Sequence, residues 1–338
     1  MSVRFSRTRR VAIGVGIATL AVGSAPSFAE PSQARLDKTL FPIPMGPVDP
    51  TPCPPPKLPP GPPGKPPPPP QLAESSIPTP KAPPQRKVDL APIAGKGIWV
   101  TVFPGGSINA ASLVATAHAD GLDQIWIRTG STHDGYYGAP LLSRLLPLAH
   151  AAGISVIAWD FPTMSNPAVD AERAVAAVRA GVDGFSPDIE TQAEGTYLTA
   201  RRVAYYLSLV RSALGKVPIV ATVPRPLAGE PLTYPYAAEA PFVDAFAPMV
   251  YWSCNEPGTA LAAAMVALQR LRPVAPIGQA YDMASEGGRH GLPTAQEIWR
   301  FLDVAHKRGA LGASLYDIET SGSQDLLALA RYPWTPTG

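Results

Sequence analysis

The sequence predicts an α/β fold, a single (β/α)8 barrel preceded by a signal peptide and a disordered proline-rich stalk. Eight short β-branched runs alternate with apolar-periodic segments from about residue 95 onward. The preceding chain is basic and apolar at its start and then rich in proline. We therefore expect a signal peptide at 1–29, an extended or disordered linker at 30–94 and the barrel domain at 95–338.

The first segment has the features of a secretory signal. Met1 to Arg10 holds four arginines and no acid, Val11 to Gly23 is apolar, and Ser27-Phe28-Ala29 is a small-x-small cleavage site. The apolar run is shorter than the roughly 20 residues that a membrane-spanning helix needs. We expect a secreted or cell-wall-associated protein with no membrane span after processing. The pair Arg9-Arg10 leaves the choice between the Sec and Tat export routes open.

The second segment holds 21 of the 43 prolines between Pro42 and Pro84. Proline lacks a backbone donor and fixes φ, so this segment forms neither a helix nor a strand ladder. We expect an extended spacer in which residues before about Ala94 make few contacts with the barrel.

Eight predicted strands follow at regular spacing. They are Gly97 to Phe103, Gln124 to Thr129, Ser155 to Phe161, Gly184 to Glu190, Pro218 to Val223, Ala245 to Trp252, Pro276 to Asp282 and Ala313 to Thr320. Helical stretches such as Tyr197 to Leu214 separate them. Eight even units over about 235 residues, ending near Arg331, favour a closed barrel over an open doubly wound sheet.

A local repeat marks three helix ends. The pattern Ala-His-x-x-Gly occurs at 117–121, 149–153 and 305–309, each time shortly before a strand. Glycine suits the left-handed residue that ends a helix, and histidine suits the negative end of the helix dipole. Thr294 and Glu297 have the spacing of a capping box. We interpret these residues as structural.

Charge and cysteine content narrow the function classes. The formal net charge is +2 and the basic residues are scattered, so we expect no nucleic-acid partner. Cys53 and Cys254 do not have zinc-ligand spacing, and we expect neither a metal site nor a cofactor. A bridge between these cysteines stays open. We expect a monomer.

The predicted strands end in acids and aromatic residues, which in such a barrel would stand on the functional face. We predict that substrate contacts this set: Asp160, Trp252, Asp282, Tyr316, Asp317, Tyr136 and Tyr137. Aromatic faces with carboxylates and no cationic cluster favour neutral sugar rings over anionic substrates. The expected partner is therefore a glycan.

The fourth predicted strand carries the strongest signal. Period-2 alternation sends Ser186, Asp188 and Glu190 to one face, with the two carboxyl residues about 7 Å apart at their Cα atoms. Each carboxyl group opposes ionisation of the other. A glutamic acid that is protonated near neutral pH can protonate a leaving glycosidic oxygen.

This stretch resembles the fourth-strand signature Asp-Gly-x-Asp-x-Asp-x-Glu of glycoside hydrolase family 18, the chitinases and related endo-N-acetylglucosaminidases. Asp183, Gly184, Asp188 and Glu190 fit it, and Met249-Val250-Tyr251 resembles the family's sixth-strand Met-x-Tyr. The resemblance implies acid-catalysed cleavage of an N-acetylated polymer such as chitin or peptidoglycan. It implies that Glu190 is the general acid, that Asp188 orients the acetamido group and stabilises an oxazolinium ion, and that Tyr251 bonds the acetamido carbonyl.

Three positions depart from that signature, and alternatives remain. Ser186 stands where the family has its first inward aspartate, Pro187 replaces an apolar strand residue, and Trp252 stands where an aspartate is usual. A proline in a central strand removes a ladder donor, so we expect a local irregularity there. The alternatives are a non-catalytic glycan-binding barrel, a metal-assisted hydrolase and a route like that of the family 25 lysozymes. In a purely structural reading, Asp188 and Glu190 pair with a cation such as Arg128 or Arg225.

Overall fold

The computed structural model describes residues 72–84, 87–229 and 232–335. The predicted signal peptide, most of the predicted linker and Cys53 lie outside the described residues and stay predictions. Among the residues that are described, no helix has the length and apolar character needed to cross a membrane.

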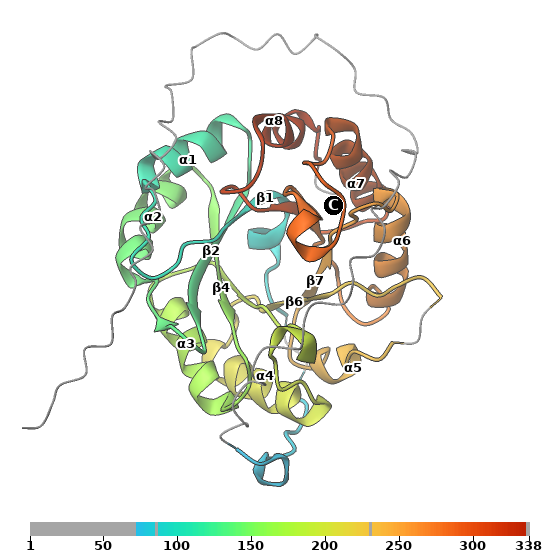
Figure 1. Ribbon diagram of the computed structural model, residues 1–338. Helices are drawn as coiled ribbons and strands as arrows, with labels where there is room; N and C mark the ends of the chain where they lie inside the picture. The colour runs from blue at the N-terminus through green and yellow to red at the C-terminus, as the bar shows by residue number, and fades with distance from the viewer. Residues whose placement is uncertain (1–71, 85–86, 230–231, 336–338) are drawn as a thin grey trace, which may run out of the picture. The chain divides into compact units, whose positions relative to one another are not determined.

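Eight strand–helix units form the predicted barrel (Figure 1). Its strands are β1 (Gly95–Val100), β2 (Gln124–Ser131), β4 (Ser155–Phe161), β5 (Gly184–Pro187), β6 (Val220–Pro224), β7 (Ala245–Val250), β8 (Ile277–Gln279) and β9 (Gly312–Tyr316). The helices are α1 (Ala110–Ala119), α2 (Ala139–Ala151), α3 (Pro167–Arg179), α4 (Ala200–Leu214), α5 (Tyr236–Glu239), α6 (Pro257–Leu268), α7 (Ala295–Lys307) and α8 (Ser323–Arg331). A two-residue strand, β3 (Gly135–Tyr136), pairs antiparallel with the end of β2.

The sheet closes on itself next to the fourth-strand motif. Its order is β5-β4-β2-β1-β9-β8-β7-β6, and each neighbouring pair is parallel. No continuous ladder joins the edge strands β5 and β6 in the described residues, and their backbones pair at isolated bridges, Phe185 with Ile219 and Asp188 with Thr222. Pro187 stands between those bridges and has no backbone N–H to donate. The irregularity expected at this proline is therefore present, and Asp188 lies at the seam of the barrel.

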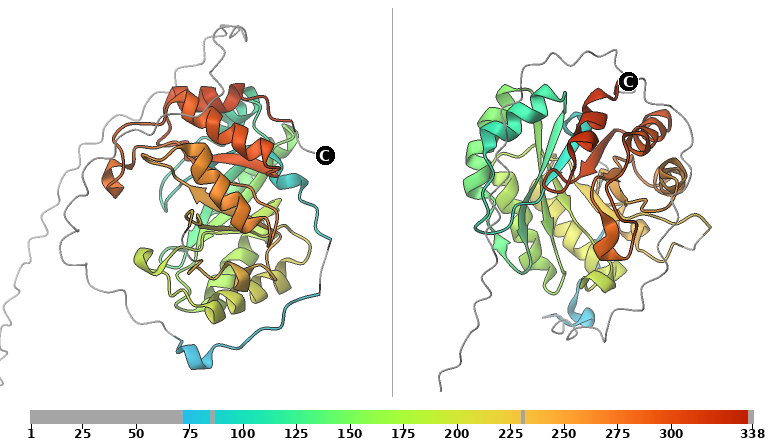
Figure 2. Two further views of the ribbon diagram at one scale, coloured as in Figure 1. Left: turned by 90° about the vertical axis from the view of Figure 1, so that its right-hand side faces the viewer. Right: turned by 45° about the horizontal axis from the view of Figure 1, so that its top comes forward.

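Alternation along the strands produces two apolar layers. Outward residues such as Ile125 and Phe185 pack beneath the helices, whereas Trp99, Trp126 and Trp159 fill the interior. The Trp99 and Trp126 rings stack with centroids 4.9 Å apart, and Trp159 lies 5.4 Å from Trp99. The helices surround the strands in both views of Figure 2. Large buried aromatic rings thus fill the barrel beneath the strand ends.

The predicted helix ends are confirmed. Gly121, Gly153 and Gly309 follow α1, α2 and α7 with φ of +61°, +73° and +71°. These are left-handed values that glycine adopts without steric cost. Thr294 and Glu297 form the expected capping box at the start of α7.

The last part of the predicted linker contacts the barrel. Glu74 forms an ion pair with Arg202 of α4 at 3.0 Å and accepts a hydrogen bond from the Thr199 hydroxyl at 2.7 Å. Ile77 is buried. The expectation of few contacts before residue 94 is therefore wrong for this stretch. The physical reason is its composition, since residues 72–77 contain no proline and supply an apolar side chain.

Cys254, which follows β7, is disulfide-bonded. The sequence has one other cysteine, Cys53, which lies outside the described residues.

Candidate active site

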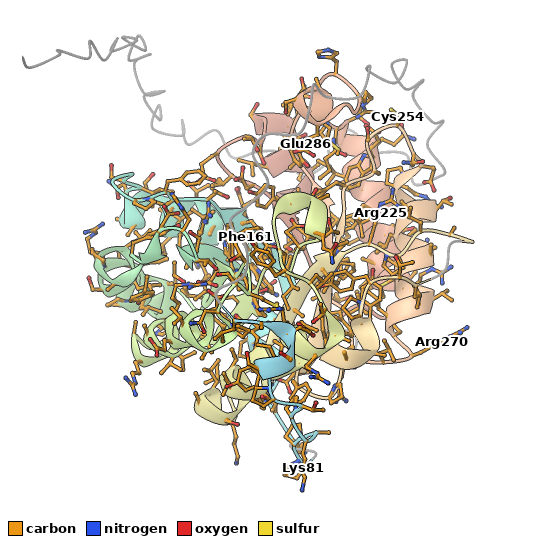
Figure 3. All side chains as sticks on the ribbon, turned by 60° about the horizontal axis from the view of Figure 1, so that its bottom comes forward. Lys81, Phe161, Arg225, Cys254, Arg270 and Glu286 are labelled. Carbon is orange, nitrogen blue, oxygen red and sulfur yellow. The ribbon has the colours of Figure 1, made fainter. Side chains whose placement is uncertain are left out.

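The carboxyl ends of the eight strands open on one side of the barrel because the strands run parallel. Figure 3 labels four residues from this region: Phe161 ends β4, and Arg225, Cys254 and Glu286 follow β6, β7 and β8. Residues that point inward at these ends form what we call the mouth of the barrel.

Asp188 and Glu190 follow the last residue of β5, and the structure brings both to the mouth. The hydroxyl of the buried Ser186, two residues earlier, donates to the Val220 carbonyl at 2.7 Å and lies 2.8 Å from the Thr222 hydroxyl. These bonds join β5 to β6 below the two acids. The serine thus has a structural role at the position where the family signature has an aspartate.

Both carboxyl groups are shifted toward their protonated forms. Burial raises the pKa of Asp188 well above its usual range, Glu190 adds to this shift, and the Arg128 charge opposes it. Burial, with a smaller contribution from the Glu194 charge, raises the pKa of Glu190 to about 7. Glu190 can therefore hold a proton near neutral pH and release it within the site.

Three tyrosines form a wall opposite the two acids. Tyr251 follows β7, Tyr281 follows β8 and Tyr316 ends β9, with ring centroids 5.4 to 6.0 Å apart. Burial raises the pKa of Tyr251, and the charges of its tyrosine neighbours, Asp188 and Glu190 add to this shift. The predicted catalytic trio of Asp188, Glu190 and Tyr251 therefore meets in one place.

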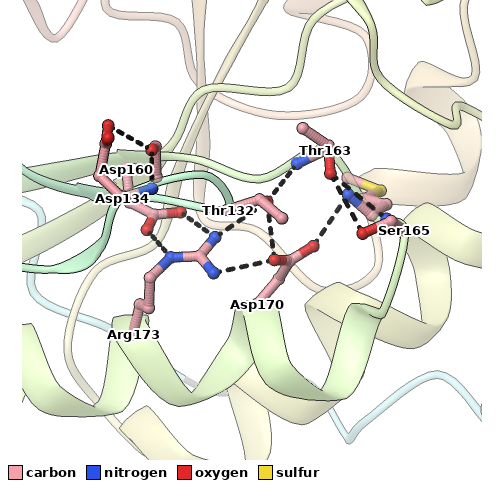
Figure 4. A network of polar contacts seen from close by, with 9 residues as sticks. Thr132, Asp134, Asp160, Thr163, Ser165, Asp170 and Arg173 are labelled. Atoms are coloured by element: carbon pink, nitrogen blue, oxygen red, sulfur yellow. Dashed lines mark hydrogen bonds and ion pairs between the residues drawn. The ribbon is translucent and has the colours of Figure 1, made fainter. Parts of the chain in front are cut away.

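Asp160 does not line the mouth, so this prediction is wrong. Its fully buried carboxylate points outward beneath α3 and pairs with the Arg173 guanidinium (Figure 4). Arg173 also bonds Asp170 at 2.9 Å, and Thr132 completes the network. A buried carboxylate held in this way supports the fold rather than a substrate.

Three other predicted contacts have local structural surroundings. Trp252 is fully buried with its ring 5.5 Å from Phe301, and Asp317 is buried and accepts bonds from the Thr320 N–H and hydroxyl. Asp282 is exposed and caps the short helix that follows it. Trp252 and Asp317 have structural roles, and the prediction that they contact substrate is wrong.

The two tyrosines of the loop after β2 have different surroundings. Tyr136 packs against the outer apolar layer. The Tyr137 hydroxyl donates to the Val102 carbonyl at 2.9 Å, while burial raises its pKa to about 12 against the opposing Arg128 charge. Tyr137 thus stands near Arg128 at the mouth.

Sequence reasoning missed three residues of the mouth: Arg128, Trp159 and Tyr281. Arg128 had been considered only as an ion-pair partner for the acids, yet no described carboxylate lies within 4.0 Å of its guanidinium. Its guanidinium carbon lies 4.7 Å from the Phe103 ring centroid and 5.2 Å from that of Trp159. The signal that could have found all three is the alternation of each strand, counted from its buried residues.

A metal site is not formed by the described side chains, among which no group of three or more His, Cys, Asp or Glu residues could hold an ion. The metal-assisted alternative requires that three or more of Asp160, Asp188, Glu190, Asp282 and Asp317 converge on one ion, and these described side chains form no such group.

The described strands and helices define a (β/α)8 barrel. No protein-family model and no curated protein matches the sequence. Among solved structures, a chitinase from Chromobacterium violaceum is similar with a TM-score of 0.54 and 12% identity over 70% of this chain and 98% of that one. The spore cortex-lytic enzyme SleL of Bacillus cereus has a TM-score of 0.54 and 10% identity over 71% and 74%. The chitinase-like agglutinin RobpsCRA of Robinia pseudoacacia is similar with a TM-score of 0.52 and 13% identity, over 71% of this chain and 99% of that one. The predicted resemblance to the chitinase barrel is thus confirmed for the fold.

Proposed function

We propose that this chain is an exported glycoside hydrolase that cleaves a glycan next to an N-acetylated sugar. The observation that carries the proposal is Glu190, a carboxyl group with a pKa of about 7 that stands beside Asp188 and faces a tyrosine wall. The fold likeness to a chitinase and to a spore cortex-lytic enzyme supports the substrate class. The predicted signal peptide supports export.

Each role follows from what the side chain can donate or accept. Glu190 protonates the leaving glycosidic oxygen, a contribution worth typically 10²- to 10⁴-fold in rate. The Asp188 Oδ1 atom is buried and has no hydrogen-bond partner among the described residues, so it can accept the acetamido N–H. The Tyr251 hydroxyl, which makes no hydrogen bond to a described residue, can donate to the acetamido carbonyl.

The proposed reaction has two steps. The acetamido oxygen attacks the anomeric carbon as the glycosidic bond breaks, and the proton of Glu190 goes to the leaving oxygen. Glu190, now a carboxylate, takes a proton from the water that opens the oxazolinium ring. Asp188 stabilises the positive charge of that ring in between.

Ser186 favours a second candidate, a barrel that binds glycan without cleaving it. The serine removes the charge that the family signature places below Asp188, and a chitinase-like agglutinin shares this fold. Ser186 at this position leaves the three tyrosines of the wall in place to bind a glycan.

Incubation with chitooligosaccharides, peptidoglycan fragments and plain glucans, followed by mass analysis of the products, tests the proposal. Hydrolysis confined to N-acetylated substrates supports it. Tight binding with no product from any of them supports the binding protein instead, and cleavage of plain glucans at equal rate contradicts the role of the acetamido group.

A further inference from the structure

Arg128 is a half-buried cation at the mouth without a counter-ion in contact. It points inward near the end of β2, and its buried Nε atom has no hydrogen-bond partner among the described residues. The Arg128 guanidinium lies over the rings of Phe103 and Trp159. These neutral rings leave its buried Nε–H donor without a hydrogen-bond partner among the described residues, which is costly for a donor removed from water.

Three buried arginines elsewhere in the fold are compensated. Arg173 bonds Asp160 and Asp170, Arg211 pairs with Asp244, and the guanidinium of Arg289 meets both oxygens of Glu297 at 2.7 and 3.0 Å. The fold therefore supplies carboxylates where its arginines serve structure. At Arg128 the described residues supply none.

The acids nearest to Arg128 do not fill this role. Asp160 is already bound to Arg173, and Asp188 is within range of the Arg128 charge without forming an ion pair. Burial outweighs that charge and raises the pKa of Asp188. Arg128 therefore stands at the side of the mouth next to β2 without a described carboxylate in contact.

We propose that Arg128 binds a carboxylate of the substrate, so that the glycan contains an acidic sugar, either a uronic acid or a sugar with a lactyl ether. The inference rests on the proposed function and names the substrate class of the same site. A guanidinium presents two parallel N–H donors that match the two oxygens of a carboxylate. A phosphate would bring up to two negative charges toward Asp188 and Glu190, whereas a carboxylate brings one.

An acidic sugar differs from the neutral sugar that the sequence predicts. That prediction depends on the absence of a cationic cluster, and a single arginine within a strand is not a cluster. Whether such an arginine is available to substrate depends on which side chains the fold places against it.

Binding measurements on the full chain carrying Glu190→Gln test the proposal without turnover. Titration calorimetry would compare an N-acetylglucosamine–muramic acid tetrasaccharide with its carboxyl-reduced form, and an N-acetylglucosamine–glucuronic acid tetrasaccharide with its reduced form. We expect one acidic ligand to bind about 10- to 100-fold more tightly than its reduced partner, as for a charge-assisted pair of hydrogen bonds. The pair that shows the preference identifies the source of the carboxylate.

Variants then assign the preference to the residue. Arg128→Gln should abolish it, and Arg128→Lys should retain only part, because lysine keeps the charge but loses the planar fork. The control is Arg270→Gln, which removes an equal charge from an exposed arginine after α6, and this variant should keep the preference.

Equal binding of acidic and reduced ligands to the Glu190→Gln chain overturns the inference even if no Arg128 variant folds. Binding of neither ligand overturns it as well. A preference that survives Arg128→Gln overturns it as well. The two proposals fail separately: a wild type that binds acidic glycans but cleaves nothing refutes the hydrolase, whereas one that cleaves neutral chitooligosaccharides as fast as acidic ones refutes the role of Arg128.

Discussion

Trp159 and Asp160 are consecutive residues of β4 whose side chains lie on opposite faces of the strand. The Trp159 ring lies inside the barrel beside Arg128, whereas the Asp160 carboxylate pairs with Arg173 beneath α3. The consecutive residues Tyr251 and Trp252 are separated in the same way, because Tyr251 packs with the interior layer and Trp252 with the layer beneath the helices. In both pairs the first residue faces the interior.

Asp160→Asn should destabilise the protein without disabling the site. The substitution removes a buried carboxylate from Arg173, and breaking such a pair costs about 3 kcal/mol or more. Denaturant unfolding measures this loss, and turnover per folded molecule should stay near wild type. Asp282→Asn is the control, because asparagine caps a helix about as well as aspartate does. A stable Asp160→Asn protein with impaired turnover would place Asp160 in the site after all.

Glu190→Gln should lower hydrolysis by about 10²- to 10⁴-fold and leave glycan binding nearly unchanged. Glutamine keeps the shape of the side chain but has no proton to donate at neutral pH. Product formation and calorimetric Kd values for the same oligosaccharide measure the two effects. Full activity in this variant contradicts the assignment of the general acid.

The raised pKa of Glu190 predicts two pH effects. Activity should fall as pH rises through about 7, because the general acid loses its proton there. Between pH 4.5, the ordinary pKa, and about 7, the folded chain binds more protons at Glu190 than the unfolded chain does. Stability should therefore decrease with pH across this window. Glu190→Gln removes that loss, so its stability relative to wild type should grow from pH 4.5 to 8, and a constant difference would contradict the shift.

Asp188→Asn should lower kcat selectively for N-acetylated substrates. The amide can still occupy the space but stabilises the positive charge of an oxazolinium ring less well than a carboxylate does. Kinetics on matched acetylated and de-acetylated oligosaccharides test this. If the wild type already cleaves both at the same rate, the catalytic partner of Glu190 must be sought elsewhere.

A chain that begins at Lys87 should melt below the full mature protein. It loses the ion pair of Glu74 with Arg202 and the buried side chain of Ile77. Burial of an isoleucine side chain contributes about 1.5 to 3 kcal/mol. Calorimetric melting of both chains gives the comparison, with Ile77→Ala in the full chain as a check on the apolar share. Equal melting temperatures would show that residues 72–77 add no stability.

The strand positions could be predicted because each strand of a barrel is a short β-branched run of near-constant spacing. Ser155–Phe161 agrees with its prediction at both ends. For other strands the predicted end lies too far along the chain. The strand that begins at Gly184 ends at Pro187 instead of at the predicted Glu190. The composition stays β-like there, but the backbone leaves the sheet to form the mouth.

The site was only partly predictable because alternation was applied to one strand. At Asp188 and Glu190 the two-residue period was used, and both acids lie where it places them. On other strands the polar character of Asp160 and Asp317 was taken as a sign of the mouth. Asp160 pairs with Arg173, which lies on another element, and Asp317 accepts hydrogen bonds within the turn after β9. Neither arrangement is visible in the local sequence pattern.

The stacked pair of Trp99 and Trp126 closes the barrel from below, with Trp159 above it. A polymer therefore cannot pass through the barrel, and under the proposed function a long glycan would lie across the strand ends. Substrate would then arrive, and both fragments would depart, on a single side of the molecule. How far the chain extends past the cleavage point on either hand is then decided by the loops around the rim and not by the depth of the barrel.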